Sequence, residues 1–183
     1  REHSLATPLE MALSRDGKTL YVAAFGSSTV GVLPAKALED DSFDPRTASQ
    51  RYVSVSGGGP SGLVLDWSGK RLFVATRFDN GISLIDTKAG QEIHHVTLHN
   101  PEPAKVVEGR PILYDAQRTS SNGEASCASC HVFGDLDSLA WDLGNPDDDT
   151  IVNPAEVNLE PVIRLARAFV VPFFERLNGT GEV

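Results

Sequence analysis

The fold is decided by the stretch Leu13-Ser14-Arg15-Asp16-Gly17-Lys18-Thr19-Leu20-Tyr21-Val22. The same pattern returns 52 residues later as Leu65-Asp66-Trp67-Ser68-Gly69-Lys70-Arg71-Leu72-Phe73-Val74. In both stretches a Gly-Lys pair, preceded by Asp16 or Ser68, separates two apolar runs. Glycine supplies the positive φ that a tight turn needs, so each stretch predicts a β-hairpin.

The repeat extends on both sides of these hairpins in one register. Pro8 corresponds to Pro60, and Val30 corresponds to Ile82. The first unit predicts strands at 10–14, 19–24, 29–33 and 51–55, and the second at 62–66, 71–76, 82–86 and 92–98. Four strands per unit and repetition at this period indicate propeller blades or a solenoid. An ordinary β-sandwich, with a chance likeness between two hairpins, is the alternative.

These units resemble the YVTN-type propeller repeat, in which a proline leads into S-x-D-G-K-x-L-Y-V. Residues 14–22 fit that pattern, whereas Ala23-Ala24 and Ala75-Thr76 stand where the family's name puts Thr-Asn. The resemblance implies a partial β-propeller of about two four-stranded blades over residues 1–103.

Two blades do not close a propeller, which typically takes four to eight. We therefore expect unpaired edges and uncovered apolar faces. Because the chain also starts at Arg1 rather than at a methionine, we expect it to be a piece of a longer protein. The alternative is that something else covers those faces. Residues 35–50 interrupt the first unit as an acidic insertion, which we expect to form a surface loop.

A second informative stretch is Cys127-Ala128-Ser129-Cys130-His131, which contains both cysteines of the chain. C-x-x-C-H is the pattern of c-type haem attachment. Residues at i and i+3 of a helix face the same way, so the sulfurs of Cys127 and Cys130 can each bond a vinyl group of one porphyrin. The neutral imidazole of His131 is then an axial ligand of the iron. The sequence predicts one covalently attached haem c.

Three other kinds of site use similar residues. A thioredoxin-like C-x-x-C normally follows a buried strand, but residues 120–126 form a polar, turn-forming approach. A structural zinc site needs four ligands, and His94, His95 and His99 would complete one only by a long-range coincidence. A plain disulfide accounts for both cysteines and leaves His131 unexplained. Haem attachment is the interpretation that uses all three residues of the motif.

Beyond residue 103 the spacing of apolar residues changes from alternating to helical. Helices are predicted at 104–115, 135–143 and 159–168, with Pro111 either starting or kinking the first of them. We expect residues 104–183 to form a mostly α-helical, cytochrome c-like haem-binding domain that is truncated here. The fold class predicted for the whole chain is therefore multidomain, β then α.

The run leading to His131 resembles the first haem site of the bacterial dihaem cytochrome c peroxidase family and its methylamine-utilisation relatives. That family shows G-x-x-L-F-x-D-x-x-L-S-x-x-G-x-x-S-C-x-S-C-H. In residues 109–131, Tyr114 takes the aromatic position, Asp115 the acid, and Thr119-Ser120 the Leu-Ser position without its leucine. The resemblance implies an exported haem oxidoreductase or electron carrier. Arg110 is a candidate partner of a haem propionate, with a surface charge as the alternative.

The dihaem enzymes need a second C-x-x-C-H motif. This chain contains only a single such motif, at residues 127–131. A second haem lies beyond Val183, or the protein is a monohaem carrier. The sixth iron ligand is open. We expect Met11 to lie in the core of the first blade, and His94, His95 and His99 to be solvated rather than to reach the iron.

The net charge of −9 and the pI near 4.9 argue against a nucleic-acid partner. The apolar stretch 168–174 is too short to span a membrane and contains a proline. Since haem c is attached outside the cytosol, we expect a periplasmic or otherwise exported protein whose leader is absent from this chain.

Electron transfer with a redox partner protein or a small electron donor is the expected function. A peroxidase-like oxidoreductase is the enzyme class that the resemblance implies, although the sequence assigns no catalytic residue. The alternative from another class is a propeller interaction or sensor module whose haem is structural.

Overall fold

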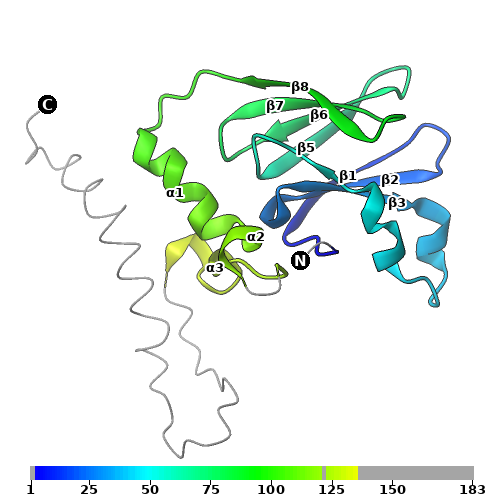
Figure 1. The fold of residues 1–183 in the computed structure, drawn as a ribbon, viewed down its shortest axis with the longest axis horizontal. Helices are drawn as coiled ribbons and strands as arrows, with labels where there is room; N and C mark the ends of the chain where they lie inside the picture. The colour runs from blue at the N-terminus through cyan, green and yellow to red at the C-terminus, as the bar shows by residue number, and fades with distance from the viewer. Residues whose placement is uncertain (1–2, 121–122, 136–183) are drawn as a thin grey trace, which may run out of the picture. The chain divides into compact units, whose positions relative to one another are not determined.

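The computed structural model describes residues 3–120 and 123–135 of the chain (Figure 1). Two four-stranded antiparallel sheets come first and short helices follow, which confirms the expected order of β before α. The chain divides into two compact units, the first ending at Ser129 and the second beginning at Cys130. The helix predicted at 159–168 and nearly all of the one at 135–143 lie outside the described residues.

Each sheet is a meander, with the strand order β1-β2-β3-β4 in the first and β5-β6-β7-β8 in the second. The first sheet contains β1 (Pro8–Leu13), β2 (Thr19–Ala24), β3 (Thr29–Pro34) and β4 (Val53–Ser54). The second contains β5 (Pro60–Leu65), β6 (Arg71–Thr76), β7 (Gly81–Asp86) and β8 (Gln91–Thr97). Every predicted strand is present, and the arrangement is compatible with two neighbouring propeller blades.

The two sheets repeat each other in backbone conformation as well as in sequence. The first strand of each sheet carries a β-bulge near its start. Gly17 and Gly69, the turn glycines of the two hairpins, both have φ of 70°. Ser28 and Asn80, also 52 residues apart, are left-handed as well, with φ of 51° and 59°. Left-handed backbone is uncommon outside glycine, so its recurrence at equivalent positions shows that the internal repeat is structural.

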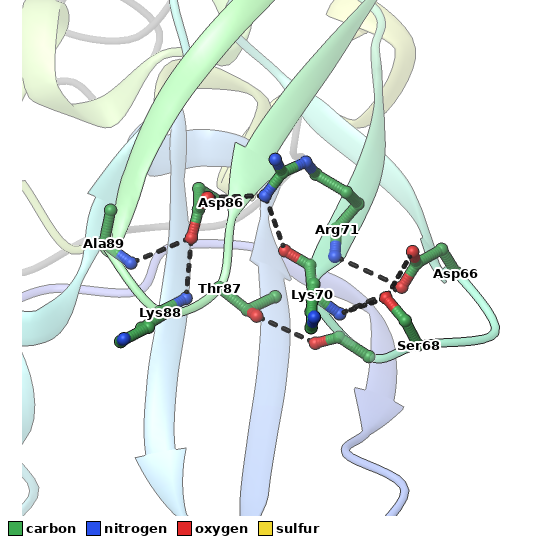
Figure 2. Close-up of polar contacts among 9 residues, drawn as sticks. Asp66, Ser68, Lys70, Arg71, Asp86, Thr87, Lys88 and Ala89 are labelled. Carbon is green, nitrogen blue, oxygen red and sulfur yellow. Dashed lines mark hydrogen bonds and ion pairs between the residues drawn. The ribbon is translucent and has the colours of Figure 1, made fainter.

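Carboxylates hold the turn of the second hairpin (Figure 2). Asp66 accepts hydrogen bonds from the backbone N–H groups of Lys70 at 2.9 Å and Arg71 at 3.2 Å, and from the hydroxyl of Ser68 at 2.8 Å. The Ser68 hydrogen bond is the main cause that holds the pKa of Asp66 below its ordinary value. Arg71 also pairs with Asp86, where the next turn begins. This cluster fixes the positions of the two turns.

The main core lies between the two sheets. The first sheet contributes one face, with Tyr21, Ala23, Val30, Val32 and Val53, and the second contributes the facing side chains Leu63, Leu72, Val74 and Ile85. Alternating residues of a strand point to opposite sides of a sheet, so the period-2 pattern of the sequence puts these residues together. Burial of such side chains is worth roughly 1.5–3 kcal/mol each, which makes this contact the main support of the two sheets.

The insertion covers the other face of the first sheet. It forms the 3₁₀ helices η2 (Ala35–Glu39) and η3 (Pro45–Arg51), and Asp44 caps η3 by accepting a hydrogen bond from the N–H of Arg46. Ala48 is buried against Val22 and Leu33. The expectation of a plain surface loop was therefore incomplete, because apolar side chains inside this acidic segment close a second, smaller core.

The first two helices follow the second sheet directly. They are α1 (Ala104–Tyr114) and α2 (Ala116–Thr119). The first begins at Ala104 and continues through Pro111, so Pro111 does not start it. Two short elements come last, α3 (Cys127–Cys130) and the 3₁₀ turn η4 (Val132–Gly134). Within the described ranges, no helix is both long and apolar enough to cross a membrane.

Candidate functional site

The C-x-x-C segment forms the short helix α3, and two serines explain why it begins where it does. The N–H of Ser129 donates to the carbonyl of Ser126 at 3.0 Å, and the N–H of Ser126 donates back to the hydroxyl of Ser129 at 3.1 Å. This reciprocal pattern resembles a capping box. The first turn of the helix therefore starts at Cys127, directly after Ser126.

Both thiols of the motif are free. Cys127 is half-buried, Cys130 is exposed, and neither is in a disulfide. Each sulfur is thus present as the thiol that thioether formation would consume. Over residues 3–120 and 123–135, no three side chains of His, Cys, Asp or Glu gather as a metal-binding group.

His131 is buried, and one of its ring nitrogens is already engaged. Its Nδ1 lies 2.9 Å from the carbonyl oxygen of Asp135. A carbonyl oxygen only accepts hydrogen bonds, so Nδ1 is the donor, and in the neutral ring the lone pair then lies on Nε2. The turn that brings the carbonyl back is closed by the N–H of Gly134, which donates to the carbonyl of His131 at 2.9 Å. A neutral imidazole with Nε2 free is the form that ligates iron. The donor chemistry therefore fits an axial haem ligand.

Asp115, the acid of the run that resembles the peroxidases, joins the helices to the sheets. One oxygen of its carboxylate accepts a hydrogen bond from the N–H of Gln117 at 2.9 Å, which caps α2. The other accepts from the hydroxyl of Ser28 at 3.0 Å. The same hydroxyl accepts from the N–H of Gly59, in the connection between the two sheets, at 3.3 Å. Asp115 therefore positions α2, whose chain leads on to the C-x-x-C-H segment.

Aromatic rings pack beside this hydrogen bond. Phe25, in the 3₁₀ helix η1 (Phe25–Ser27) after β2, makes edge-to-face contacts with Phe78 at 5.1 Å and with Tyr114 at 5.5 Å between ring centroids. Contacts of this geometry add about 0.5–1.5 kcal/mol beyond simple burial. Tyr114, predicted only as the aromatic of a motif, thus anchors the end of α1 on Phe25, whose ring also packs on Phe78 of the second sheet.

Arg110 is neither a surface charge nor free for a propionate, which corrects both expectations for it. Its side chain is 9% exposed and pairs with Glu102 at 2.6 Å. Its guanidinium also donates to the backbone carbonyls of Arg77 at 2.8 Å and Phe78 at 3.3 Å. The Arg110 hydrogen bond is the main cause that holds the pKa of Glu102 below its ordinary value. Arg110 therefore ties α1 to the loop after β6.

The histidines before the helices differ in their availability. Both ring nitrogens of His95 are engaged, Nε2 with Asp79 at 2.6 Å and Nδ1 with Ser83 at 2.9 Å. The expectation of a solvated His95 is wrong, because its side chain is only 20% exposed and lies within a polar network. His94 is exposed. In this arrangement His95 has no nitrogen free for a metal.

Met11 does not lie in the core of the first sheet. It was expected in the core of the first sheet, yet it is 66% exposed. Its strand, β1, pairs with β2 on one side, and Met11 stands opposite Val22. Val22 is covered by the insertion, whereas Met11 on the neighbouring strand is not.

A cavity of about 240 Å³ opens between the two sheets. Its walls include Tyr21, Val32 and Leu72, and Arg51 and Lys88 also line it. None of the residues lining it belongs to the C-x-x-C-H segment. The cavity is therefore separate from the candidate haem site.

Comparisons with known proteins show no family. The sequence matches no protein-family model and no curated protein. Among solved structures, a chain of hydrazine synthase from Kuenenia stuttgartiensis aligns with a TM-score of 0.41 and 20% identity. The alignment covers 51% of this chain and 24% of that chain. A likeness at this level carries no argument about fold or function.

Proposed function

We propose that this chain is an exported c-type haem protein that transfers electrons. Cys127 and Cys130 would hold the haem through thioether bonds, and His131 would ligate its iron. The observation that carries the proposal is the state of His131 beside two free thiols, since the carbonyl of Asp135 engages Nδ1 and leaves Nε2 with its lone pair. A redox partner protein or a small electron donor would supply the electrons.

The chain's own residues would have two tasks in this role, attaching the haem and orienting its iron ligand. The two cysteines fix the haem in place, so that it is not lost on reduction or oxidation. The Asp135 carbonyl holds the His131 ring in one tautomer and orientation, and raises the basicity of Nε2 as a ligand. A bound haem would supply one-electron chemistry at a potential set by its axial ligands and burial.

The two sheets would form part of a β-propeller that supports the haem segment. The contacts that favour this role are those of Asp115 with Ser28 and of Arg110 with the carbonyls of Arg77 and Phe78. They fasten α1 and α2, the helices immediately before the haem motif, to the loops of both sheets. A propeller would thereby provide a rigid base, with recognition of a redox partner as its second task.

Peroxidase-like chemistry is a second candidate function. It requires a sixth ligand position on the iron that is open or displaceable. One observation favours it, namely that both nitrogens of His95 are engaged by Asp79 and Ser83 and are not free to occupy that position. An exposed His94 is the competing sixth ligand.

Redox kinetics test the proposal. The full chain would be expressed with a secretion leader and haem-maturation machinery, and then mixed with a small one-electron donor and with ferricyanide in turn. Electron transfer predicts complete, reversible reduction over repeated cycles. A haem that stays oxidised with every donor would contradict the proposal and leave a structural or sensory haem. Oxidation of the donor by added peroxide would identify the peroxidase-like activity.

A further inference from the structure

The cavity between the two sheets is lined by cations and by no acid. Its volume is about 240 Å³, and the turn between β7 and β8 forms one of its walls. Arg51 and Lys88 lie on it, whereas none of the described residues that line it is Asp or Glu. The whole chain has a net charge of −9, so a wall with positive charge alone runs against the composition. A cavity with charge of one sign attracts ligands of the opposite sign, here an anion.

Both cations are available to a ligand. Within residues 3–120 and 123–135, neither Arg51 nor Lys88 forms an ion pair, and both residues are exposed. Arg51 is the last residue of η3, whose first turn is capped by Asp44. Its planar guanidinium matches the two oxygens of a carboxylate, which it binds through two parallel hydrogen bonds.

The hydroxyl of Tyr21 is a third polar group at the cavity. Tyr21 is only 7% exposed, yet its hydroxyl forms no hydrogen bond with any other residue of the described ranges. Burial raises the pKa of Tyr21 above its ordinary value, so the hydroxyl keeps its proton at neutral pH. A buried donor without an acceptor is unfavourable, and an oxygen of a bound anion would supply that acceptor.

Apolar side chains form most of the remaining wall. They come from both sheets and are Val30, Val32, Val53, Leu72 and Ile85. Sites for drug-sized molecules measure about 300–1,000 Å³ and combine such walls with a few polar groups. This cavity is smaller, so its ligand is a small molecule with an apolar body and one charged end.

The backbone donors of the turn are already used, which distinguishes a carboxylate from a phosphate. The N–H groups of Lys88 and Ala89 both donate to the carboxylate of Asp86 at 3.0 Å (Figure 2). The N–H of Gly90 donates to the carbonyl of Asp86 at 2.8 Å. Phosphate sites commonly rely on several free N–H groups of a turn or a helix N-terminus. An anion in this cavity is left with side-chain donors, which suit the single charge of a carboxylate.

We propose that the cavity binds a small organic carboxylate with an apolar body. The carboxylate pairs with Arg51, accepts a hydrogen bond from the Tyr21 hydroxyl and lies within the field of Lys88. The apolar body packs between the sheets, against Leu72 and Ile85. The site shares no residue with the C-x-x-C-H segment, so the proposal does not depend on the haem.

Calorimetric titration of the full chain with 3-phenylpropionate tests the proposal. This probe has one carboxylate and one apolar ring, and its dissociation constant should be about 1 mM or below. The neutral 3-phenylpropanamide and the bodiless acetate should each bind roughly tenfold more weakly or not at all. Equal binding of either control, or no binding of 3-phenylpropionate, would overturn the proposal. Tighter binding of inorganic phosphate would overturn the choice of ligand class.

Substitutions at the cavity separate its donors from the general charge of the chain. Arg51→Gln should weaken binding of 3-phenylpropionate roughly tenfold, and Lys88→Gln about two- to fivefold. Tyr21→Phe should weaken it about two- to fivefold and change the melting temperature of the free chain by about 2 °C or less, because the hydroxyl has no partner to lose. Lys36→Gln, at an exposed position of η2 away from the cavity, removes the same charge and is the control. Equal effects of Arg51→Gln and Lys36→Gln would overturn the assignment of the site.

Nuclear Overhauser effects locate the probe in the parent chain without any substitution. The ring protons of 3-phenylpropionate should show contacts with the methyl groups of Leu72 and Ile85, which line the cavity. Val64, which is 65% exposed on β5 and does not line the cavity, is the internal control and should show none. Contacts with Val64 in place of Leu72 and Ile85 would show binding at an outer face and overturn the proposal.

Discussion

The hydroxyl of Ser28 donates a hydrogen bond to the carboxylate of Asp115 at 3.0 Å, across 87 residues of sequence. Ser28 lies in the left-handed turn between β2 and β3, and Asp115 lies between α1 and α2. This hydrogen bond fastens the helices that precede the C-x-x-C-H motif to the first sheet, together with the packing of Tyr114 on Phe25. A residue predicted only as the acid of a motif has a positioning role that the sequence did not reveal.

Removal of this contact should loosen the helices. Asp115→Ala should lower the free energy of unfolding by about 2 kcal/mol, because it removes both the cap of α2 and a buried acceptor. Ser28→Ala should lower it by about 1 kcal/mol, and the double variant should cost less than the sum, because the two residues share one hydrogen bond. Urea unfolding measures these values. Asp41→Ala, at an exposed position of the insertion, is the control and should have no effect; strict additivity would refute the contact.

His95 should be structural. His95→Ala should destabilise the second sheet by about 1–3 kcal/mol, because Asp79 and Ser83 each lose their hydrogen bond to the His95 ring. The ferric haem spectrum should not change, since neither nitrogen of His95 is free. His94→Ala, at the exposed neighbouring position, is the control and should leave stability unchanged. A change of spin state on loss of His95 would show that the histidine ligates the iron instead.

The pair of Glu102 and Arg110 should make stability depend on acid pH. The folded chain holds the pKa of Glu102 below its ordinary value, so the stabilisation is fully present above about pH 4.5 and is lost as the pH falls through the folded pKa. The free energy of unfolding of Glu102→Gln should therefore fall less steeply between about pH 5 and pH 3 than that of the parent chain, because the variant has no carboxyl to protonate at this position. Denaturant titrations at each pH measure the slope. The control Glu10→Gln, on an exposed part of β1, should keep the slope of the parent chain; identical slopes for all three chains would rule out the pair.

A side chain at Gly59, in the connection between the two sheets, should destabilise the fold. A Cβ there would stand 2.6 Å from the ring of Phe78, and the backbone has φ of +55°. At Gly17 the backbone is equally left-handed, with φ of +70°, but nothing lies within 4 Å of the added atom. Gly17→Ala should cost about 1 kcal/mol of unfolding free energy from backbone strain. Gly59→Ala should cost about 1–3 kcal/mol more, because Phe78 must move. Urea unfolding measures both costs. Equal losses of unfolding free energy for Gly17→Ala and Gly59→Ala would contradict this prediction, because they would show that the Phe78 ring moves without cost.

Local signals explain why the sheets could be predicted from the sequence. The Gly-Lys turns at Gly17 and Gly69 and the alternating apolar residues around them determine hairpins without help from distant residues. The role of the insertion could not be predicted in this way. Its few apolar residues, Ala48 among them, acquire a partner only once β2 and β3 present their outer face.

In the candidate site, too, the features set by local sequence could be predicted, and those set by contacts of the folded backbone could not. The motif Cys127, Cys130 and His131 can be recognised from spacing, and Ser126 and Ser129 could have been predicted as helix caps from their positions around Cys127. The acceptor for His131 is a backbone carbonyl, which every residue has, so no sequence signal points to Asp135. The same applies to Arg110, whose partners include two carbonyls of a distant loop.

Covalent attachment of haem to residues 127–131 tests the central claim most directly. The full chain, exported with haem-maturation machinery, should keep its haem through acid–acetone extraction, and mass spectrometry should find the haem on the peptide that contains Cys127 and Cys130. The variants Cys127→Ser and Cys130→Ser should each shift the α-band of the reduced pyridine complex, since one thioether is lost. Complete removal of haem from the parent chain by extraction, with both cysteines recovered as unmodified thiols, would contradict the account.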